Sequence, residues 1–404
     1  MRILYIVPFV PWPLRVRSYN LIPRLARRNE IYLLCLTGSD EEERRAQSLR
    51  EVCQEIRFVR HTKLRAFWQC ALALATPVPL RMAYFASPDM RAAVQQAITE
   101  FSPEVIYLER WRTLQYVPAN VQVPVICDPT DSMLLYNQRL MRTGAWWERV
   151  VGFEEYLKFR RYEAKLAGRA KMVVFCSQVD LECVQKIASA ARYAVVPNGV
   201  DCETFFPKQP QEEEPNTIVF CGHFGYSPNR HAVRFFLKRI FPLIRQQIPN
   251  ANFIAVGKGA AQHLEKESRN LAGLEVVGFV PDLRHYIAKA AVAVAPITVG
   301  AGVSNKLAEA FATGTPVVAT RLPCGDLPVR DGVHLLLADD PKAFAEKVVR
   351  LLREPDLRRH LALNARRFVE ATYDWEIVAG KMEGLMNMAV QGSARSNAPT
   401  VSFA

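Results

Sequence analysis

Hydrophobic and polar stretches alternate along the chain in a way that predicts repeated strand–helix units. Short apolar runs rich in aliphatic residues occur at 3–7, 30–36, 105–108 and 123–127, and again at 218–222. Longer stretches with helical periodicity separate them, and successive parallel strands need a crossover of this length. The pattern therefore predicts an α/β protein built from doubly wound parallel sheets.

Several individual elements can be expected from the same pattern. A helix is expected from Ser18 to Arg28, with Ser18 as its N-cap. One or two aromatic-rich helices are expected within 133–170, and an amphipathic helix is expected over 341–371. We expect the short apolar run at 172–176 to close the first sheet.

The segment from 292 to 320 carries the most specific chemistry. A β-type run opens into a loop with Gly300 and Gly302, which is followed by a short helix and a second strand. Glycines at such a place let a ligand approach the backbone, and a helix N-terminus offers free N–H groups to an anion. Lys306 adds a cation, and Glu309, one helical turn further on, can accept hydrogen bonds from two hydroxyl groups. Together these features predict a nucleotide-sugar pocket.

A simpler interpretation of this segment stays open. The loop lacks the third glycine of a dinucleotide fingerprint, because position 305 is Asn. Glycine loops between strands and helices are common as plain turns, and a single Lys or Glu is often a solvated surface charge.

Six short motifs, in the expected order, resemble those of the retaining, family-4 type of glycosyltransferase. They are Val196–Asp201, Ile218–Gly222, Ala255–Gly259, Val277–Asp282, the segment 296–319 and Tyr373–Glu376. The resemblance covers nearly the full length and implies the GT-B fold, in which two Rossmann-like doubly wound parallel-sheet domains face a central cleft. It also implies transfer of a sugar from a nucleoside diphosphate-sugar to an acceptor, with retention of configuration.

The length of 404 residues, half of them hydrophobic, allows two cores. Together with the resemblance, this length predicts an N-terminal acceptor-side domain over 1–193 and a C-terminal donor domain over 194–372. A helix at 373–390 is expected to cross back and complete the first domain, and 391–404 is expected to be a disordered tail.

The resemblance also implies a set of site residues. Glu309 would hold the donor ribose, Lys306 the diphosphate, and the loop backbone the phosphates and the sugar. The expected donor-binding residues are Gly222, Asn229, Arg230, Gly257, Val280, Gly300, Ala301, Gly302, Val303, Ser304, Lys306 and Glu309. No metal or cofactor is expected, because lysine, arginine and a helix N-terminus neutralise the leaving diphosphate and the donor loop has no Asp-x-Asp pair.

Two departures from the family pattern affect the interpretation. Where many members have a first donor-site glutamate, this chain has Ala301, and we interpret Lys306 as part of a variant Gly-x-Gly, Lys, Glu motif. Where members have a histidine near the reacting carbon, this chain has Thr130 or Asp131. Asp131 is therefore predicted to be catalytic together with Lys306 and Glu309.

Positive charge on the first half predicts the acceptor side and a partner surface. The net charge is +12, and residues 1–195 hold 28 Lys/Arg against 19 Asp/Glu, whereas the remainder holds 24 against 21. Arg15 and Arg17, near the start of the first helix, are expected to contact a phosphate or the acceptor. An anionic membrane surface is the favoured partner of the basic clusters, with ordinary solvated faces as the alternative. Nucleic acid is not expected, because the clusters are dispersed and no RNA- or DNA-binding module is present.

Cysteine usage and the N-terminus predict the compartment. The nine cysteines include no Cys-x-x-Cys pair, which predicts neither a disulfide framework nor a zinc site. No signal peptide is expected, because a strand begins at Ile3, and the longest apolar run, 67–79, is shorter than the roughly 20 residues of a membrane span. The expected location is cytoplasmic, at the inner face of the plasma membrane, where a lipid-linked acceptor would be met.

Two other functions remain as alternatives. A non-catalytic nucleotide-sugar-binding scaffold would explain Ala301 and the missing histidine. A GT-B nucleotide-sugar epimerase would use the same nucleotide site without an acceptor.

Overall fold

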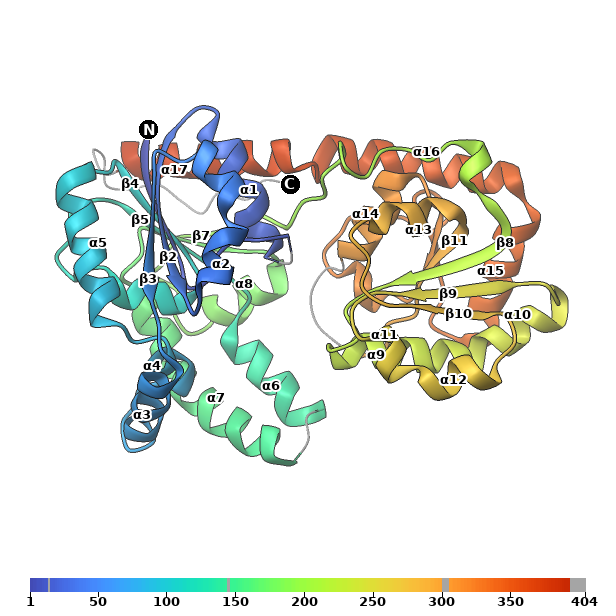
Figure 1. Cartoon of the computed structure of the whole chain (residues 1–404), viewed down its shortest axis with the longest axis horizontal. Helices are drawn as coiled ribbons and strands as arrows, with labels where there is room; N and C mark the ends of the chain where they lie inside the picture. Colours follow the sequence, from blue (N-terminus) through green and yellow to red (C-terminus); the bar gives the residue numbers. More distant parts are fainter. Residues whose placement is uncertain (14, 144–145, 300–304, 393–404) are drawn as a thin grey trace. The chain divides into compact units, whose positions relative to one another are not determined.

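The computed structural model describes residues 1–13, 15–143, 146–299 and 305–392. The chain divides into two compact units (Figure 1). Within the described residues, unit 1 comprises Met1–Asn198 and the segment from Val378 onward, and unit 2 comprises Gly199–Ile377. The chain thus passes between the units at 198/199 and at 377/378, where the sequence indicated 193/194 and 372/373.

Unit 1 is built on a parallel sheet of seven strands in the order β3-β2-β1-β4-β5-β6-β7. The strands are β1 Arg2–Val7, β2 Glu30–Thr37, β3 Glu55–Arg60, β4 Val105–Glu109, β5 Val125–Thr130, β6 Met172–Phe175 and β7 Tyr193–Val195. The central strands β1, β4 and β5 are buried almost throughout, which explains why they are continuous apolar runs. The strand order reverses between β1 and β4, the position at which open α/β sheets bind ligands.

The helices of unit 1 connect these strands and follow local signals. They are α1 Val16–Ala26, α2 Asp40–Arg45, α3 Lys63–Ala73, α4 Leu80–Tyr84, α5 Pro88–Phe101, α6 Met133–Thr143, α7 Trp146–Ala167 and α8 Gln178–Gln185, with the short 3₁₀ helices η1 Gln47–Glu51 and η2 Trp111–Tyr116. Helix α5 begins where Ser87 accepts a hydrogen bond from the Met90 amide, and it ends at Ser102 in a left-handed conformation. Helix α17, Trp375–Gln391, starts in unit 2 and continues into unit 1.

Two expectations about unit 1 were wrong in detail. The first helix begins at Val16, so Ser18 lies inside it on its buried face and is not the N-cap. Strand β6 does not close the sheet, because the short strand β7 pairs with it from Tyr193 to Val195. A three-residue strand is too short to show a period in the sequence.

Unit 2 contains a second parallel sheet, with six strands in the order β10-β9-β8-β11-β12-β13. The strands are β8 Glu214–Cys221, β9 Asn252–Val256, β10 Leu274–Val277, β11 Ala290–Ala295, β12 Val317–Ala319 and β13 Leu336–Leu337. Here the order reverses between β8 and β11. The loops after these two strands are therefore the expected place for a ligand.

The helices of unit 2 are α9 Ser227–Phe235, the π-helix η4 Phe236–Ile240, α10 Phe241–Gln247, α11 Ala260–His263, α12 Glu265–Asn270, α13 Leu283–Lys289, α14 Asn305–Thr313, α15 Pro341–Arg353 and α16 Pro355–Thr372, with the 3₁₀ helices η3 Pro210–Glu212 and η5 Leu322–Cys324. The single helix expected over 341–371 is two helices. Pro355 has no amide hydrogen and occupies the first position of α16, where none is needed, so it ends one helix and starts the next.

Candidate functional site

Lys306 and Glu309 lie on α14, the helix that follows β11 at the reversal of the unit 2 sheet. The Lys306 Nζ donates a hydrogen bond to Asn229 Oδ1 at 3.0 Å and lies 5.0 Å from the centre of the Phe220 ring. Asn229 is on α9, the helix that follows β8. The structure thus places three predicted donor-site residues, Asn229, Lys306 and Glu309, at the same edge of one sheet.

Burial changes the acid–base properties of this pair. Burial lowers the pKa of Lys306 to about 8, although the negative charge of Glu309 acts in the opposite direction. Burial also raises the pKa of Glu309, and the Lys306 charge lowers it. A lysine and a glutamate whose pKa values are shifted toward each other at a sheet reversal are typical of a functional site.

Gly222 and Gly257 are required for the close approach of two strand ends. A Cβ on Gly257 would lie 2.0 Å from the Gly222 carbonyl oxygen, and Gly257 has a φ of +140°. A Cβ on Gly222 would lie 2.9 Å from Asn229 Nδ2. Both glycines therefore shape the backbone beside Asn229, whether or not they also contact a ligand.

Arg230 and Val280 have other surroundings. The Arg230 Nη1 donates hydrogen bonds to Phe224 O at 2.6 Å and to Gly225 O at 2.8 Å, so this nitrogen holds the turn after β8. Val280 follows β10 and packs, partly buried, against the core of unit 2. Gly300, Ala301, Gly302, Val303 and Ser304 lie outside the described residues, and their part in the donor site stays a prediction.

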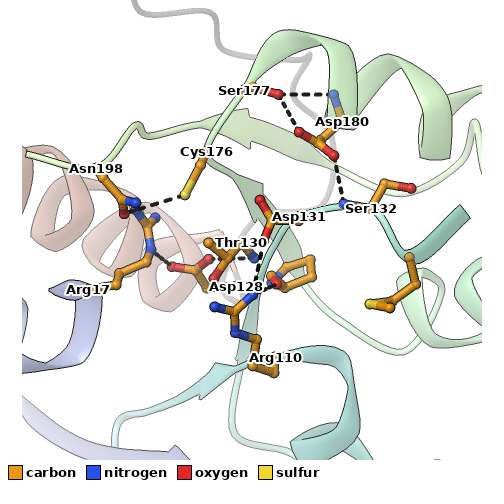
Figure 2. A network of polar contacts seen from close by, with 12 residues as sticks. Arg17, Arg110, Asp128, Thr130, Asp131, Ser132, Cys176, Ser177, Asp180 and Asn198 are labelled. Atoms are coloured by element: carbon orange, nitrogen blue, oxygen red, sulfur yellow. Dashed lines mark hydrogen bonds and ion pairs between the residues drawn. The ribbon is translucent and has the colours of Figure 1, made fainter. Parts of the chain in front are cut away.

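The second group of predicted residues forms a polar network at the reversal of the unit 1 sheet (Figure 2). The Arg17 guanidinium, from α1, donates to Asp128 at the end of β5, and its Nη1 also donates to Asn198 Oδ1 at 3.2 Å. The Tyr107 hydroxyl donates to the same Asp128 carboxylate. Arg17 and Asp128 are fully buried, with side chains 3% and 0% exposed. Arg17 is thus an internal partner of Asp128.

Thr130 and Arg110 stand in strained backbone conformations on neighbouring strand ends. Their φ angles are 71° and 75°, in the left-handed region that a β-branched residue such as Thr rarely adopts. The Thr130 amide donates to Asp128 Oδ1 at 3.1 Å, which contributes to holding this geometry. Within the described parts of the chain, the buried Thr130 Oγ1 and Arg110 Nε have no hydrogen-bond partner. A strained backbone and buried polar atoms without hydrogen-bond partners together indicate a ligand-binding site.

Asp131 is the accessible carboxylate of this network. It is 56% exposed, and its Oδ2 lies 3.2 Å from Arg110 Nη1. The backbone of the next residue, Ser132, is held in place, because its amide donates a hydrogen bond to Asp180 Oδ1 at 2.8 Å (Figure 2). The structure therefore places Asp131 and Thr130 side by side, with Arg110 holding the carboxylate.

Two functional candidates were missed by the sequence analysis. Glu109 is buried at the end of β4, and burial raises its pKa to about 7 against the opposing effect of Arg110. Arg112 has its pKa lowered to about 9, first by burial and then by the charges of Arg110, Arg81 and Arg15. The signal that could have found them is a run of charges, Glu109 to Arg112, directly after a buried strand.

Arg15 and His61 differ in their surroundings. Arg15 is exposed and its guanidinium stacks on the Phe9 ring at 4.5 Å. Its guanidinium is nevertheless partly surrounded by protein, and this partial burial lowers its pKa, which the charge of Arg110 lowers further. His61 is held between the rings of Tyr84 and Phe85, at 5.5 Å and 5.7 Å, which is a packing role. Across the described ranges, no three His, Cys, Asp or Glu side chains are grouped as a metal site would require.

The sequence family of unit 2 follows from a direct match. The family model described as "Glycosyl transferases group 1" matches residues 215–354, which run from β8 through α15. This chain carries a glycosyl transferases group 1 domain. The group 1 domain includes Gly222, Asn229, Lys306 and Glu309.

The chain is also similar to a curated mannosyltransferase. The chain is 32% identical over 235 residues to the phosphatidyl-myo-inositol mannosyltransferase of Mycobacterium tuberculosis, and the match covers 55% of this chain and 60% of the relative. The chain therefore spans about 60% of the length of this relative.

Solved structures match nearly the whole chain. Sucrose-phosphate synthase from Thermosynechococcus elongatus aligns with a TM-score of 0.70 at 16% identity, over 97% of this chain and 100% of that one. Anabaena HepE, in complex with UDP and glucose, aligns with a TM-score of 0.67 at 15% identity, over 96% and 99%. The predicted GT-B fold, with two parallel-sheet α/β domains, is thus confirmed, and the resemblance to family-4 type glycosyltransferases is confirmed by the group 1 domain. No helix in the described part of the chain has the length and apolar composition that crossing a membrane requires.

Proposed function

We propose that this protein is a retaining glycosyltransferase that binds a nucleoside diphosphate-sugar in unit 2 and a saccharide or glycolipid acceptor in unit 1. The observation that carries the proposal is the set Asn229, Lys306 and Glu309, gathered at the sheet reversal of a glycosyl transferases group 1 domain. This is the edge at which open α/β sheets bind nucleotides.

On the donor side, each residue has a chemical task in this proposal. The Glu309 carboxylate accepts hydrogen bonds from the two ribose hydroxyls, because an ionised carboxylate offers two strong acceptor atoms. The Lys306 ammonium, oriented by Asn229, pairs with the diphosphate and stabilises it as it leaves. Binding of a phosphate would favour the charged form of a lysine whose pKa is lowered to about 8. Arg230 has a supporting role, since one of its nitrogens holds the turn after β8.

On the acceptor side, the arginines indicate an anionic acceptor. The charge of Arg110 lowers the pKa values of both Arg15 and Arg112, and Arg15 also lowers that of Arg112, so the three charges lie near each other. A phosphate group would relieve this repulsion and favour the charged forms. A phosphorylated lipid or saccharide fits this chemistry, and the mannosyltransferase relative is named for a phosphatidyl-inositol substrate. Arg17 serves as a positioning residue, because Asp128 holds its guanidinium.

The proposed transfer needs no protein base. In the front-face mechanism that the family implies, the leaving phosphate oxygen takes the proton of the acceptor hydroxyl. As the proton is transferred, the sugar–phosphate bond breaks and the sugar–acceptor bond forms on the same face, which retains the configuration. Asp131, exposed and held by Arg110, can orient the acceptor hydroxyl by accepting its hydrogen bond. In this proposal the charge of Lys306 and the N–H groups of the loop backbone serve where other enzymes use a metal ion.

A stability screen tests donor binding directly. The melting temperature of the protein would be measured with UDP, GDP and ADP and with their sugars, because a ligand at 100 times its dissociation constant adds about 2.7 kcal/mol of stability. We expect one base to shift the melting temperature clearly more than the others, and the shift to be lost in Glu309→Gln. If no nucleotide raises the melting temperature of the wild-type protein, the proposed donor site is wrong.

A further inference from the structure

Helix α3 of unit 1 packs with its large apolar side chains outward. Leu64, Phe67, Trp68 and Leu72 are 72%, 67%, 62% and 72% exposed. Their spacing of three, four and eight residues from Leu64 places them on one face of the helix. The opposite face buries the small residues of the helix, Ala66 and Ala73. A surface helix of a globular protein has the reverse arrangement.

Helix α7 repeats this arrangement. Its exposed stripe consists of Trp146, Val150, Phe153 and Leu157, which are 77%, 64%, 57% and 50% exposed and follow one another at helical spacing. Its buried face is partly polar, with the carboxylates of Glu155 and Glu163. These carboxylates accept hydrogen bonds from backbone amides of Leu80 and Met133, at 2.5 Å and 2.6 Å. The second helix therefore also directs apolar side chains to solvent.

The two helices adjoin each other. The Lys158 Nζ, on α7, donates to Ala73 O at the end of α3 at 2.8 Å, and the Leu80 amide at the start of α4 donates to Glu155. Figure 1 shows α3, α4 and α7 together beyond one end of the unit 1 sheet. We call the eight exposed residues on them the outer apolar surface: Leu64, Phe67, Trp68, Leu72, Trp146, Val150, Phe153 and Leu157.

Basic residues accompany this surface, and acidic residues are absent from the sequence around α3, whereas α7 also carries Glu148, Glu154 and Glu155. The segment 60–86 contains Arg60, Lys63, Arg65 and Arg81 and no Asp or Glu. One turn beyond the stripe of α7 lie the exposed residues Arg160 and Arg161. Tryptophan, leucine and phenylalanine combined with lysine and arginine are the composition of helices that lie in a membrane interface. Aromatic rings occupy the headgroup level and basic groups attract anionic lipids.

We propose that the outer apolar surface inserts into the interface of a bilayer that contains anionic lipid. The inference rests on the proposed function in one respect, since it gives the enzyme its route to a lipid-linked acceptor. A bilayer fits better than a second copy of the chain, because a two-fold dimer through this surface would bring its basic residues near those of the partner. Insertion of these side chains would also explain why both helices expose their large apolar residues.

Vesicle binding by the whole protein tests the proposal. Sedimentation would be measured with phosphatidylcholine vesicles that do or do not contain an equal share of phosphatidylglycerol. We expect wild-type protein to bind the anionic vesicles at about 0.1 M salt, and much less at about 1 M salt, where screening is stronger. The double variant Phe67→Ser/Trp68→Ser should bind at least about tenfold more weakly, because it loses the transfer of two large side chains.

The matched control is Phe279→Ser, which removes an equally exposed aromatic side chain, 63% exposed, from unit 2. This variant should bind vesicles as the wild type does. Equal binding by the wild type and the double variant would overturn the proposal. A dimer that forms without lipid, and that the double variant abolishes while Phe279→Ser does not, would also overturn the proposal. The surface would then join two copies of the chain.

A separate readout distinguishes this inference from the proposed function. Slow release of nucleoside diphosphate from the donor, measured in solution without vesicles, should be the same in the double variant and the wild type. Vesicle binding without any turnover of a nucleotide-sugar would contradict the proposed function and leave the membrane surface standing. Turnover of a nucleotide-sugar without vesicle binding would contradict the membrane surface and leave the proposed function standing.

Discussion

The Lys306 ammonium donates a hydrogen bond to Asn229 Oδ1 across 3.0 Å, which ties the start of α14 to α9. The Asn229 amide in turn donates to His223 O at 3.0 Å, so the asparagine is fixed on both sides. The two helices follow β11 and β8, the strands between which the sheet order reverses. A cation held in this way is preorganised for a diphosphate, because little reorganisation is needed when the ligand arrives.

The first prediction concerns this cation. Lys306→Ala should weaken binding of the nucleoside diphosphate at least about tenfold, because a charge-assisted hydrogen bond of about 1.5–3 kcal/mol is lost. Binding of the nucleoside alone should change little, and calorimetric titration of both ligands measures the difference. Lys289→Ala is a matched control, since Lys289 pairs with Glu214 at 3.2 Å on the surface of the same unit. Equal losses for nucleoside and diphosphate would show that Lys306 is structural, and Arg230 would become the favoured diphosphate cation.

The second prediction concerns the buried ion pair of unit 1. Asp128→Asn should destabilise the protein by about 3–5 kcal/mol, because it leaves the Arg17 guanidinium buried without a counter-charge. The control is Asp89→Asn, which breaks the exposed pair with Arg65 at 3.1 Å and should cost less than about 1 kcal/mol. Denaturant midpoints measured by the near-ultraviolet signal compare the two variants. Similar midpoints for both would contradict the structural role given to Arg17 and Asp128.

The third prediction uses the strained backbone at Thr130. Thr130→Gly should stabilise the protein by about 1 kcal/mol, because glycine adopts a φ of 71° without a steric cost. The same change should lower transfer, since it removes a buried hydroxyl that has no hydrogen-bond partner within the described residues and is available to a ligand. Ser102→Gly relieves a similar strain at the end of α5, with a φ of 46°, and should leave transfer unchanged. Full activity in Thr130→Gly would remove Thr130 from the site.

The fourth prediction is a pH dependence of stability. Burial raises the pKa of Glu163 to about 8 from the usual 4.5. Between these values the folded protein keeps a proton that the unfolded chain releases, so stability is greatest at the acidic end of this window and falls as the pH rises. The slope is at most about 1.4 kcal/mol per pH unit. Glu109, with a pKa of about 7, adds to it at the lower end of the window.

Glu163→Gln should reduce this slope, because an amide does not titrate. Denaturation at pH 5 and pH 8 would show the variant losing less stability than the wild type. The exposed Glu370, which pairs with Arg366 at 2.7 Å, provides the control Glu370→Gln, whose slope should match that of the wild type. An unchanged slope in Glu163→Gln would mean that the carboxylate is ionised in the folded protein.

The sequence predicted the helices and strands that have a clear pattern of hydrophobic positions, and the motifs next to them. Buried parallel strands such as β1 are continuous apolar runs, and the residues that follow them stand at the ligand-binding edge by the geometry of the sheet. This is why Lys306 and Glu309 could be predicted from the sequence pattern, whereas Thr130 was predicted only through the resemblance to family-4 type glycosyltransferases. Helix starts were less predictable, because the capping preference of Ser18 was outweighed by its burial on α1.

Long-range contacts explain what the sequence could not show. The internal role of Arg17 depends on Asp128 and Asn198, which are far away along the chain. The importance of Glu109 depends on burial among charges from other strands. The outward apolar faces of α3 and α7 have an ordinary helical period, and only the packing shows that the stripe points to solvent.

The measurement that tests the central claim most directly is transfer by Glu309→Gln. A carboxylate that accepts two ribose hydroxyls is replaced by an amide with a single acceptor atom, and charge-assisted bonds of about 1.5–3 kcal/mol each are weakened. Turnover of the preferred nucleotide-sugar, followed by release of the nucleoside diphosphate, should fall ten- to several-hundredfold or more while the melting temperature without ligand stays close to that of the wild type. Wild-type turnover in Glu309→Gln would contradict the assignment of unit 2 as the donor site.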